Sequence, residues 1–509
     1  MTNQQGAYTD GRLGVRPSVS MIENVNKLEL EYELSVVQEF IQTDLAHVVM
    51  LTEVGILDDS EGGAILGALL KLKRSPNINE VLRSDPQFGG LLFQIENYLA
   101  RTCGPVGHML HTGRSRIDQD AEVMRLVARR VGMEVVEKSL EFADVVLKRS
   151  IKEIDTICPL YTQLQHGQPG TLGYYLNGQY WVMTRNLERV QQTIARYDYC
   201  SLGGVALTGT DWQIKRERVS QLLGHIGPVV HATDAGIFAL DVAPDMGASL
   251  ALLAGALGRI AGDFYYWSSS ELNYIQIDPS LCGTSSIMPQ KRNPYALERT
   301  RAIAGEAVGW MAVELGVLKS ATSTDLDVVL TDARIPGMAK QTIGALQLMA
   351  DVIRTMAVDV GKMRSSAESA WITASAIADV LVRTLRVPFR DAHGIVGRLV
   401  RLADGAMSDD RAARRGLLIR ALEESGVAAT GLTEEEWCAL MRSMESESFI
   451  ETRSSDGGAG REQRGRLTEL AKADLMSKKT HHEEIKRRVS ASEEELTKVA
   501  QRLAMKSSG

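Results

Sequence analysis

Residues 294–318 read PYALERTRAIAGEAVGWMAVELGVL, and this stretch is the clearest indicator of fold class in the chain. Its apolar positions recur at spacings of four, three, four and three residues: Ala304, Val308, Met311, Leu315 and Leu318. That spacing is close to a heptad, so these side chains form one apolar stripe along a helix. Pro294 stands where the first turn would begin, a position at which a missing N–H costs little. The stretch therefore predicts a long helix that packs in a bundle.

Similar patterns extend over much of the chain, which has 509 residues, 44% of them hydrophobic and only 5% aromatic. Met124, Val127, Val131 and Val135 form a second stripe. The small residues at 255–258 would let two helices approach closely. Because sheets favour β-branched and aromatic residues, this composition favours helix. We therefore expect an all-α fold built around long helices.

Breaks between the helices are indicated where glycine and proline gather. Residues 166–171 (HGQPGT) and 201–210 (SLGGVALTGT) have the composition of loops. Residues 278–293 show no periodicity and predict a long exposed loop, which we call the serine loop. Residues 454–460 (SSDGGAG) have the composition of a flexible linker.

The charge balance limits the possible partners. The 57 basic and 64 acidic residues give a net charge of −7, which disfavours binding to nucleic acid or anionic lipid through the overall field. The longest uncharged stretch near the middle, 246–258, has 13 residues, whereas a membrane span needs about 20. The five cysteines include no CxxC pair, and residues 1–18 contain no apolar core of a secretion signal. We expect a reduced, cytoplasmic protein with neither nucleic-acid nor membrane partners.

Residues 111–119 (HTGRSRIDQ) are the first of three polar segments, and we call them the arginine segment. Arg114 and Arg116 flank Ser115 directly after Gly113. A guanidinium presents a planar fork of donors that matches a carboxylate, and glycine lets a ligand approach the backbone. The segment is a candidate anion site. A solvated loop with surface arginines is the alternative.

The second polar segment, residues 162–169 (TQLQHGQP), is called the amide segment. It places Thr162, Gln163, Gln165 and His166 within a few residues of one another. Such a density of hydrogen-bonding groups suits a polar ligand. A polar helix end before the break at 167–169 is the alternative.

The third segment, residues 283–298 (GTSSIMPQKRNPYALE), puts Ser285 and Ser286 in a loop before Lys291 and Asn293, with Glu298 in the following helix. Serines beside a lysine and an amide can bind phosphate or carboxylate. The segment lacks the spacing of a Walker loop or a GxSxG nucleophile elbow, and the chain has no HExxH or EF-hand pattern. We therefore expect no metal and no nucleotide cofactor.

These segments together resemble a known family. Residues 283–298 closely resemble the GSSxMPxKxN signature of the fumarase/aspartase superfamily. HTGRSRIDQ, TQLQHGQP and LGGVALTGT are similar to the HTGRSRNDQ, THLQRAQP and LGAGALAGT segments of the argininosuccinate lyase branch. The order and separation of the segments also fit, and the likeness covers nearly the whole chain.

The resemblance implies a fold and a reaction. Members of the family are almost entirely helical and assemble as homotetramers. Each active site takes the three segments from three different subunits. We divide the chain accordingly into an N-terminal helical domain (1–112), a central bundle (113–363) and a C-terminal helical domain (364–509). Members eliminate a group from a succinyl skeleton and release fumarate without a cofactor. A base removes the proton beside a carboxylate, on which negative charge builds as an aci-carboxylate that preorganised donors must stabilise.

The resemblance also implies roles for individual residues. Ser285 would act as the base in its alkoxide form, supported by Ser286, while Lys291 and the loop backbone favour the negative charge. The serine loop would close over the substrate as a lid. The implied contacts to the dicarboxylate substrate come from nine residues: Arg114, Ser115, Arg116, Ile117, Thr162, Gln163, Gln165, Lys291 and Asn293.

Departures from the family pattern concern the amine side. Gln163 stands where the family has a histidine that pairs with the counterpart of Glu298, so the proposed acid has no direct successor. His166 takes the place of the family's arginine and is a catalytic candidate, with a structural role or proton transfer from water as alternatives. Ile117 replaces an asparagine. Asp325 and Asp327 are candidates to face a cationic amine. The alternative is that they lie at a solvated helix start.

We therefore hypothesise a carbon–nitrogen lyase that acts on an N-substituted aspartate other than argininosuccinate, for example an aminopolycarboxylate such as ethylenediamine-disuccinate. Three alternatives remain open at this point. One is an argininosuccinate lyase of arginine biosynthesis, which would form arginine and fumarate. The second is a relative that has lost catalysis, as lens crystallins have. The third is a helical scaffold or interaction protein, which would explain the stripes but not the polar segments.

Overall fold

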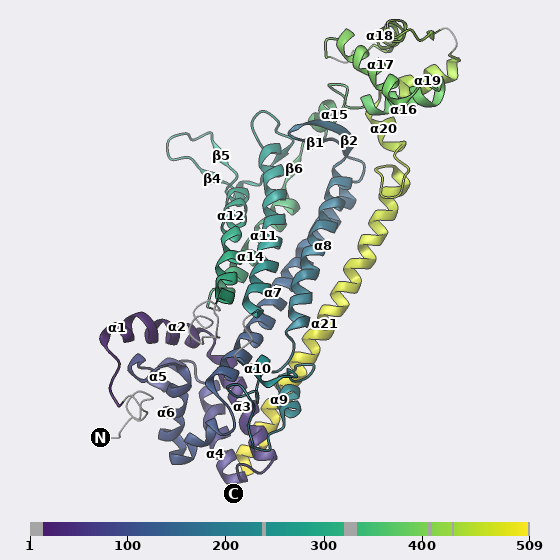
Figure 1. The fold of residues 1–509 in the computed structure, drawn as a ribbon. Coiled ribbons are helices and arrows are strands. Elements are labelled where there is room, and N and C mark those ends of the chain that lie inside the picture. The colour runs from purple at the N-terminus through teal and green to yellow at the C-terminus, as the bar shows by residue number, and fades with distance from the viewer. Residues whose placement is uncertain (1–13, 237–240, 320–332, 406–409, 430–431, 507–509) are drawn as a thin grey trace.

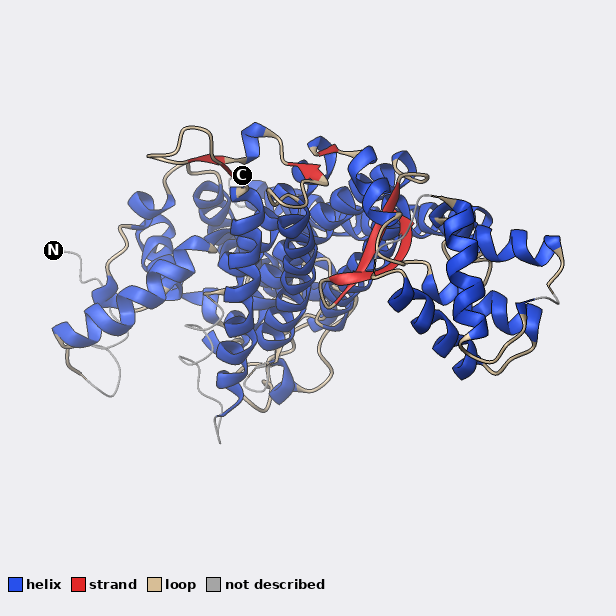
Figure 2. Ribbon diagram, turned by 90° about the horizontal axis from the view of Figure 1, so that it is seen from above, coloured by secondary structure: helices blue, strands red, loops and turns tan. Residues whose placement is uncertain are grey.

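The computed structural model describes residues 14–236, 241–319, 333–405, 410–429 and 432–506 (Figure 1). Five long helices form the centre of the molecule: α7 (Arg116–Lys152), α8 (Leu172–Arg196), α11 (Val242–Trp267), α12 (Tyr295–Leu315) and α14 (Ile335–Thr355). They run side by side as a bundle, and helices dominate the views in Figures 1 and 2. The predicted all-α fold with a bundle of long helices is confirmed.

Short helices form a layer at the end of the bundle where α7 begins: α1 (Val19–Met21), η1 (Ile22–Asn26), α2 (Lys27–Ser35), α3 (Val37–Glu53), α4 (Asp59–Lys73), α5 (Ile78–Leu82), η2 (Pro86–Phe88), α6 (Leu91–Cys103) and η3 (Gly104–His111). Between α8 and α11 lie α9 (Arg216–Leu222) and α10 (Ala232–Ala235). Segments η4 (Pro279–Leu281) and η5 (Gly316–Lys319) flank α12.

A lobe at the opposite end contains α15 (Val360–Ala367), α16 (Ala374–Leu385), α17 (Phe389–Leu402), α18 (Arg411–Glu423), α19 (Glu434–Ser443) and α20 (Ser446–Glu451). From this lobe α21 (Arg461–Lys506) runs back along the whole bundle to α4 (Figure 1). One hydrophobic core joins the N-terminal layer, the bundle and α21, whereas residues 371–444 enclose a core of their own. The expected boundary at 363/364 falls inside α15, and the three-domain division stays a prediction.

The strands form three antiparallel pairs: β1 (Ile157–Thr162) with β2 (Gln165–Thr171), β3 (Ile275–Gln276) with β6 (Ala357–Val358), and β4 (Gly283–Thr284) with β5 (Arg292–Asn293). The β1–β2 hairpin contains the amide segment, so the expectations of a loop at 166–171 and of a polar helix end were wrong. Its two-residue turn places Gln163 and Leu164 at φ +53° and +59°. Such turns favour glycine or asparagine, so these residues gave no local sign of a hairpin.

The two apolar stripes have different surroundings. Met124, Val127, Val131 and Val135 are buried on α7, as predicted. On the other stripe, Ala304 packs against Gly258 of α11, but Val308, Met311, Leu315 and Leu318 lie on the surface of the single chain, and Val308 is 77% exposed. The bundle instead buries the neighbouring face of α12, through Ile303, Ala307 and Trp310. The helix was predicted correctly, but its predicted apolar face is not part of this chain's own core.

Close helix packing and turn geometry were predicted with mixed success. A side chain at Gly258 would place its Cβ 2.3 Å from the Cβ of Ala304, so this glycine allows α11 and α12 to meet. Gly255 faces open space. Residues 454–460, expected as a flexible linker, form a turn whose backbone is tied by hydrogen bonds from Gly460 N–H to the Arg453 carbonyl (3.0 Å) and from the Tyr174 hydroxyl to the Gly457 carbonyl (2.9 Å).

A buried network of charges joins α7 to the segments that pack against its first half. His225 bridges two carboxylates, with Nε2 2.6 Å from Glu122 and Nδ1 3.0 Å from Asp198. Asp198 also pairs with Arg129 of α7 (3.2 Å) and with Arg488 of α21. Such buried charges are stable only when each has partners. The network therefore fixes α21 and the 198–201 region on α7.

We expect this network to make the protein sensitive to acid. Burial would raise the pKa of Asp198, but the hydrogen bond from His225 and the charge of Arg129 outweigh it and lower the pKa from 3.8 to about 2. A carboxylate with a depressed folded-state pKa stabilises the fold above its unfolded pKa, and the contribution is lost as pH falls through the folded pKa. The Tm should therefore fall between about pH 4 and pH 2.

Asp198→Asn should lower the Tm at pH 7 and flatten its dependence on pH in that window, as thermal unfolding at a series of pH values would show. Asp391→Asn on the exposed face of α17 is the matched control and should leave the curve unchanged. A wild-type slope retained in Asp198→Asn would contradict this account of the network.

Candidate active site

The arginine segment lies at the start of α7, where local hydrogen bonds fix it. Ser115 is the N-cap of the helix: its Oγ accepts from Ile117 N–H (3.4 Å), and its own N–H donates to Asp118 Oδ1 (2.9 Å). Together these form a capping box. Gly113 has φ +70°, a backbone conformation that favours glycine.

Asp118 connects this segment to the loop at 201–210. The carboxylate is fully buried, and its Oδ2 accepts from the N–H groups of Gly203 and Val205, both at 2.9 Å. Burial raises the pKa of Asp118, and the backbone donors act against that rise. Asp118 was not among the functional residues predicted from the sequence. The S-x-x-D spacing of residues 115–118 could have predicted the capping box. No sequence pattern could have predicted the hydrogen bonds from Gly203 and Val205.

The two arginines of the segment have opposite environments. The guanidinium of Arg114 is completely buried and lies 2.6 Å from Asp44, which is buried as well. Arg116 keeps 33% of its side chain exposed and pairs with Glu29 at 3.1 Å. The burial of Arg114 argues against the prediction that it holds a substrate carboxylate. Its partner lies 70 residues earlier, so the sequence could not reveal this role.

Titratable groups surround Arg114. Burial raises the pKa of Glu96 to about 7, and burial together with the charge of Arg114 lowers that of His111 to about 4. The two side chains approach to 3.6 Å. Burial and the charge of Arg114 also lower the pKa of His47 to about 3, and its Nε2 contacts the Thr112 carbonyl at 2.8 Å. The arginine segment therefore packs on two histidines with lowered pKa, His47 and His111, which surround the buried ion pair of Arg114 and Asp44.

The amide segment forms the tip of the β1–β2 hairpin. Gln163 and Leu164 occupy the left-handed turn, and Thr162 and Gln165 close it as a pair across the two strands. Non-glycine residues in this conformation are strained, and such strain clusters at functional sites. The hairpin therefore presents Thr162 and the two glutamines at an exposed tip.

His166 lies behind this tip in a cluster of hydroxyl groups. Its Nε2 is 3.2 Å from both the Tyr161 hydroxyl and Ser366 Oγ, and Tyr274 contacts both of these hydroxyls. Burial lowers the pKa of His166. Tyr274 and Ser366 are distant in sequence, so the sequence analysis missed them.

The serine loop extends outward from the bundle between β4 and β5 (Figure 1), and its tip is exposed as predicted. Ser285 Oγ accepts from the N–H groups of Met288 (3.1 Å) and Ile287 (3.4 Å). Ser286 and Lys291 are exposed on the same loop, and Asn293 is half-buried in β5. At Gly283 an added Cβ would lie 2.0 Å from the Tyr295 ring, so glycine is required there. In the following helix, Glu298 accepts a hydrogen bond from Tyr265 at 3.5 Å.

The three segments do not meet within one chain. The 37 residues of α7 separate the arginine segment from the hairpin by about 55 Å. The serine loop lies at the hairpin's end of the bundle but projects away from the hairpin (Figures 1 and 2). A site that combines all three needs segments from more than one chain. Asp325 and Asp327 lie outside the described residues.

Several general features of the described part of the chain bear on its chemistry. No helix there is both long and apolar enough to span a membrane. No group of three or more His, Cys, Asp or Glu side chains in that part is arranged to hold a metal ion. All five cysteines are free thiols.

Comparisons with known proteins identify the family. The family described as "Lyase" matches residues 33–309, and "Argininosuccinate lyase C-terminal" matches residues 371–412. An argininosuccinate lyase of Methanothrix thermoacetophila is 31% identical over 448 residues, covering 88% of this chain and 89% of that protein. An argininosuccinate lyase of Geobacillus kaustophilus is 33% identical over 372 residues, covering 73% of this chain and 80% of that protein.

Solved structures of similar fold support the same family. An EDDS lyase variant with bound fumarate is 26% identical and superposes with a TM-score of 0.81 over 99% of both chains. The 3-carboxy-cis,cis-muconate lactonizing enzyme of Pseudomonas putida shares the fold, at 18% identity and a TM-score of 0.64 over 87% of this chain and 95% of that one. The chain therefore belongs to the fumarase/aspartase superfamily, as a carbon–nitrogen lyase of the argininosuccinate lyase branch.

Proposed function

We propose that this carbon–nitrogen lyase eliminates an amine from an N-substituted aspartate other than argininosuccinate, releasing fumarate, and that it acts in the cytoplasm. An aminopolycarboxylate such as ethylenediamine-disuccinate is the candidate class. One observation carries the proposal: the departures Ile117 and Gln163 fall on the amine side, while the serine loop keeps Ser285, Lys291 and Asn293. The likeness to EDDS lyase over 99% of the chain supports it. The alternative is an argininosuccinate lyase, the activity named for the curated relatives.

Ser285 is the proposed base. It removes the proton from the carbon next to a carboxylate, the C–N bond breaks, and the electrons complete the double bond of fumarate. A serine hydroxyl is a weak base, but hydrogen bonds donated to its oxygen stabilise the alkoxide. The N–H groups of Met288 and Ile287 supply two such bonds. Closure of the exposed loop over the substrate would exclude water and bring Lys291 and Ser286 to the same charge.

The substrate carboxylates need fixed cations and donors. Arg116 is half-buried at the first residue of α7, where the helix N-terminus also favours an anion. We propose that Arg116 and Ser115 hold one carboxylate, with Thr162, Gln163 and Gln165 of another subunit and Asn293 of a third. Arg114 is left out of this set because its guanidinium is buried against Asp44. Ile117 is half-buried beside Arg116 and would offer the amine tail only apolar contact.

The leaving amine must gain a proton. Burial lowers the pKa of His166, so its imidazole is neutral at pH 7 and is a poor donor. We propose that His166 positions the hairpin through Tyr161 and Ser366, and that water protonates the amine. Glu298 is exposed on α12, and we propose that it has a supporting role at the end of the third polar segment, residues 283–298.

Assembly as a homotetramer would complete the site. Val308, Met311 and Leu315 form an exposed apolar face on α12, and exposed apolar faces of this kind mark protein interfaces. Helix α7 is too long for one chain to bring Arg116 and Ser285 together. We propose that four bundles pack through these faces and that each active site takes its three segments from three subunits.

The role of Ser285 can be tested directly. Ser285→Ala should lower the rate of fumarate release by about 10²-fold or more, because the general base is lost, while the circular dichroism spectrum stays unchanged. Ser60→Ala, on the exposed first turn of α4, is a matched control and should keep full activity. A Ser285→Ala protein as active as the wild type would exclude this serine as the base.

The substrate class can be tested by comparing two compounds. The pure protein should release fumarate, followed by its absorbance, faster from ethylenediamine-disuccinate than from argininosuccinate. The reason is that Ile117 removes a polar contact to the amine tail and Gln163 removes the family's proton-donating histidine. Complementation of an arginine auxotroph provides an independent measurement and should fail. Efficient turnover of argininosuccinate alone would contradict the proposed change of substrate.

Mixing two inactive variants tests the shared site. Arg116→Gln and Ser285→Ala chains, unfolded and refolded together, should recover activity up to roughly a quarter of the wild-type level, because some mixed sites contain both intact residues. Each variant refolded alone is the control and should stay inactive. If both residues came from one chain, no mixed site would be intact and activity would not return.

A further inference from the structure

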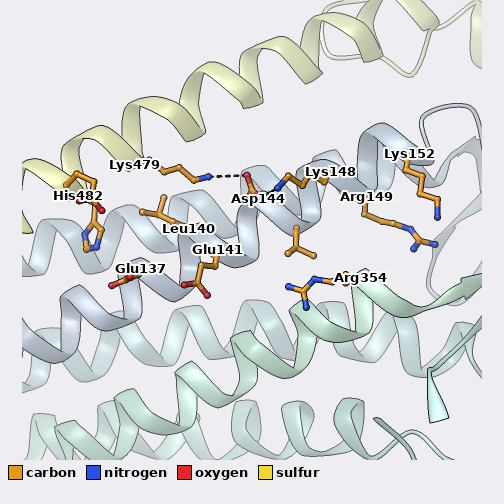
Figure 3. Close-up of a pocket in the computed structure, with 12 residues that line it drawn as sticks. Glu137, Leu140, Glu141, Asp144, Lys148, Arg149, Lys152, Arg354, Lys479 and His482 are labelled. Carbon is orange, nitrogen blue, oxygen red and sulfur yellow. Dashed lines mark hydrogen bonds and ion pairs between the residues drawn. The ribbon is translucent and has the colours of Figure 1, made fainter. Parts of the chain in front are cut away.

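A groove away from the three polar segments lies between α7, α14 and α21 (Figure 3). It has a volume of about 710 Å³, which is large enough for a small molecule. Leu140 and Val145 give it an apolar floor on α7. Helix α12, which carries the exposed apolar face, packs against α11 and α14 and does not contribute to the lining. The groove would therefore stay open if subunits associate through α12.

The charges in the groove are separated along α7. Glu137 and Glu141 lie at one end and Arg149 and Lys152 at the other, and Arg354 of α14 lies between them (Figure 3). The backbone rise is about 12 Å from residue 141 to residue 149 and about 16 Å from residue 141 to residue 152. The groove therefore has an acidic end and a basic end.

Ion pairs occupy both the middle and the ends of the groove. Asp144 lies 2.6 Å from Lys148 and 3.0 Å from Lys479, so two cations share this carboxylate. At the acidic end, Glu141 pairs with Lys138 (2.7 Å) and Glu137 with Lys486 (3.3 Å). On α14, Arg354 pairs with Asp351, and all of these side chains are a third or more exposed. Exposed pairs of this kind contribute little and exchange partners readily. A ligand would therefore bind by exchanging with these exposed pairs.

Two buried side chains point to a ligand independently of the charge pattern. Arg149 and His482 line the groove and are more than nine-tenths buried. Arg149 uses Nη2 to bind Glu153 and the Met356 carbonyl, each at 3.0 Å, but its Nε has no hydrogen-bond partner among the described residues. His482 Nε2 has none either in that part of the chain. A buried polar atom without a partner costs free energy, which a bound molecule would recover.

We propose that this groove binds a small, elongated zwitterion, with a cationic amine or guanidinium at Glu137 and Glu141 and a carboxylate at Arg354, Lys152 and Arg149. Such a molecule places an opposite charge at each end and its aliphatic chain over Leu140 and Val145. Amino acids with a distal amino group have this chemistry. The site lies apart from the substrate segments, so its ligand does not compete with the substrate and the inference does not depend on the proposed reaction.

Three probes of matched length test the proposal on the full-length protein. 6-Aminohexanoate carries both charges, hexanoate only the carboxylate and hexylamine only the amine. Ligand-observed NMR titrations should show 6-aminohexanoate binding about tenfold more tightly than either singly charged probe, because each end adds a charge-assisted contact. Equal affinity for all three probes would overturn the proposal.

Variants then locate the binding. Glu141→Gln and Arg354→Gln should each weaken 6-aminohexanoate binding about tenfold and abolish its advantage over one singly charged probe. Both residues are exposed, so circular dichroism and Tm should stay unchanged. Glu435→Gln and Arg401→Gln, exposed in the C-terminal lobe, are matched controls and should bind as the wild type does. Unchanged binding in both groove variants would show that the probe binds elsewhere and would overturn the assignment.

Discussion

Helix α7 sets the distance on which the organisation of this lyase depends. Its 37 residues are held straight by packing against α8, α14 and α21, with the arginine segment at its first turn and the β1–β2 hairpin just beyond its last. A helix of this length cannot bring its two ends together. The proposed site, which combines both ends of α7, would therefore need association between chains, and the apolar face left exposed on α12 is the proposed surface for it.

The arginine segment and the serine loop have different electrostatic environments, and both bear on the proposed elimination. At the first turn of α7, Arg116 pairs with Glu29 and keeps a third of its side chain exposed, while the buried Arg114 is neutralised by Asp44. The proposed carboxylate would bind at Arg116 and the helix N-terminus in competition with Glu29. On the serine loop, the backbone donates hydrogen bonds to Ser285 before any substrate is present. Donors that are already oriented need no reorganisation when negative charge develops. In the proposed reaction, closure of the exposed serine loop over the substrate would complete this environment.

Substitutions on the amine side separate this chain from the family pattern without disturbing the hairpin. Gln163 occupies a left-handed position in the turn, and His166 is held by hydroxyl groups behind it. The hairpin thus keeps its shape although the family's histidine is absent. Ile117 is half-buried next to Arg116 and offers a tail no hydrogen bond. Specificity would then come from the loss of polar contacts around the amine, with the succinyl half unchanged.

The sequence by itself determined the helical class, the long helices α7 and α12, the exposed serine loop and the family, because periodicity and contiguous motifs are local properties. It also located the segments that hold Arg116, Thr162 and Ser285. Only the tertiary structure decided that Arg114 is a buried ion-pair partner, that the amide segment is a hairpin, and that the α12 stripe faces outward. Those features depend on Asp44, on unusual turn residues and on neighbouring helices. Burial and partner choice arise from contacts between residues far apart in the chain, which no local pattern encodes.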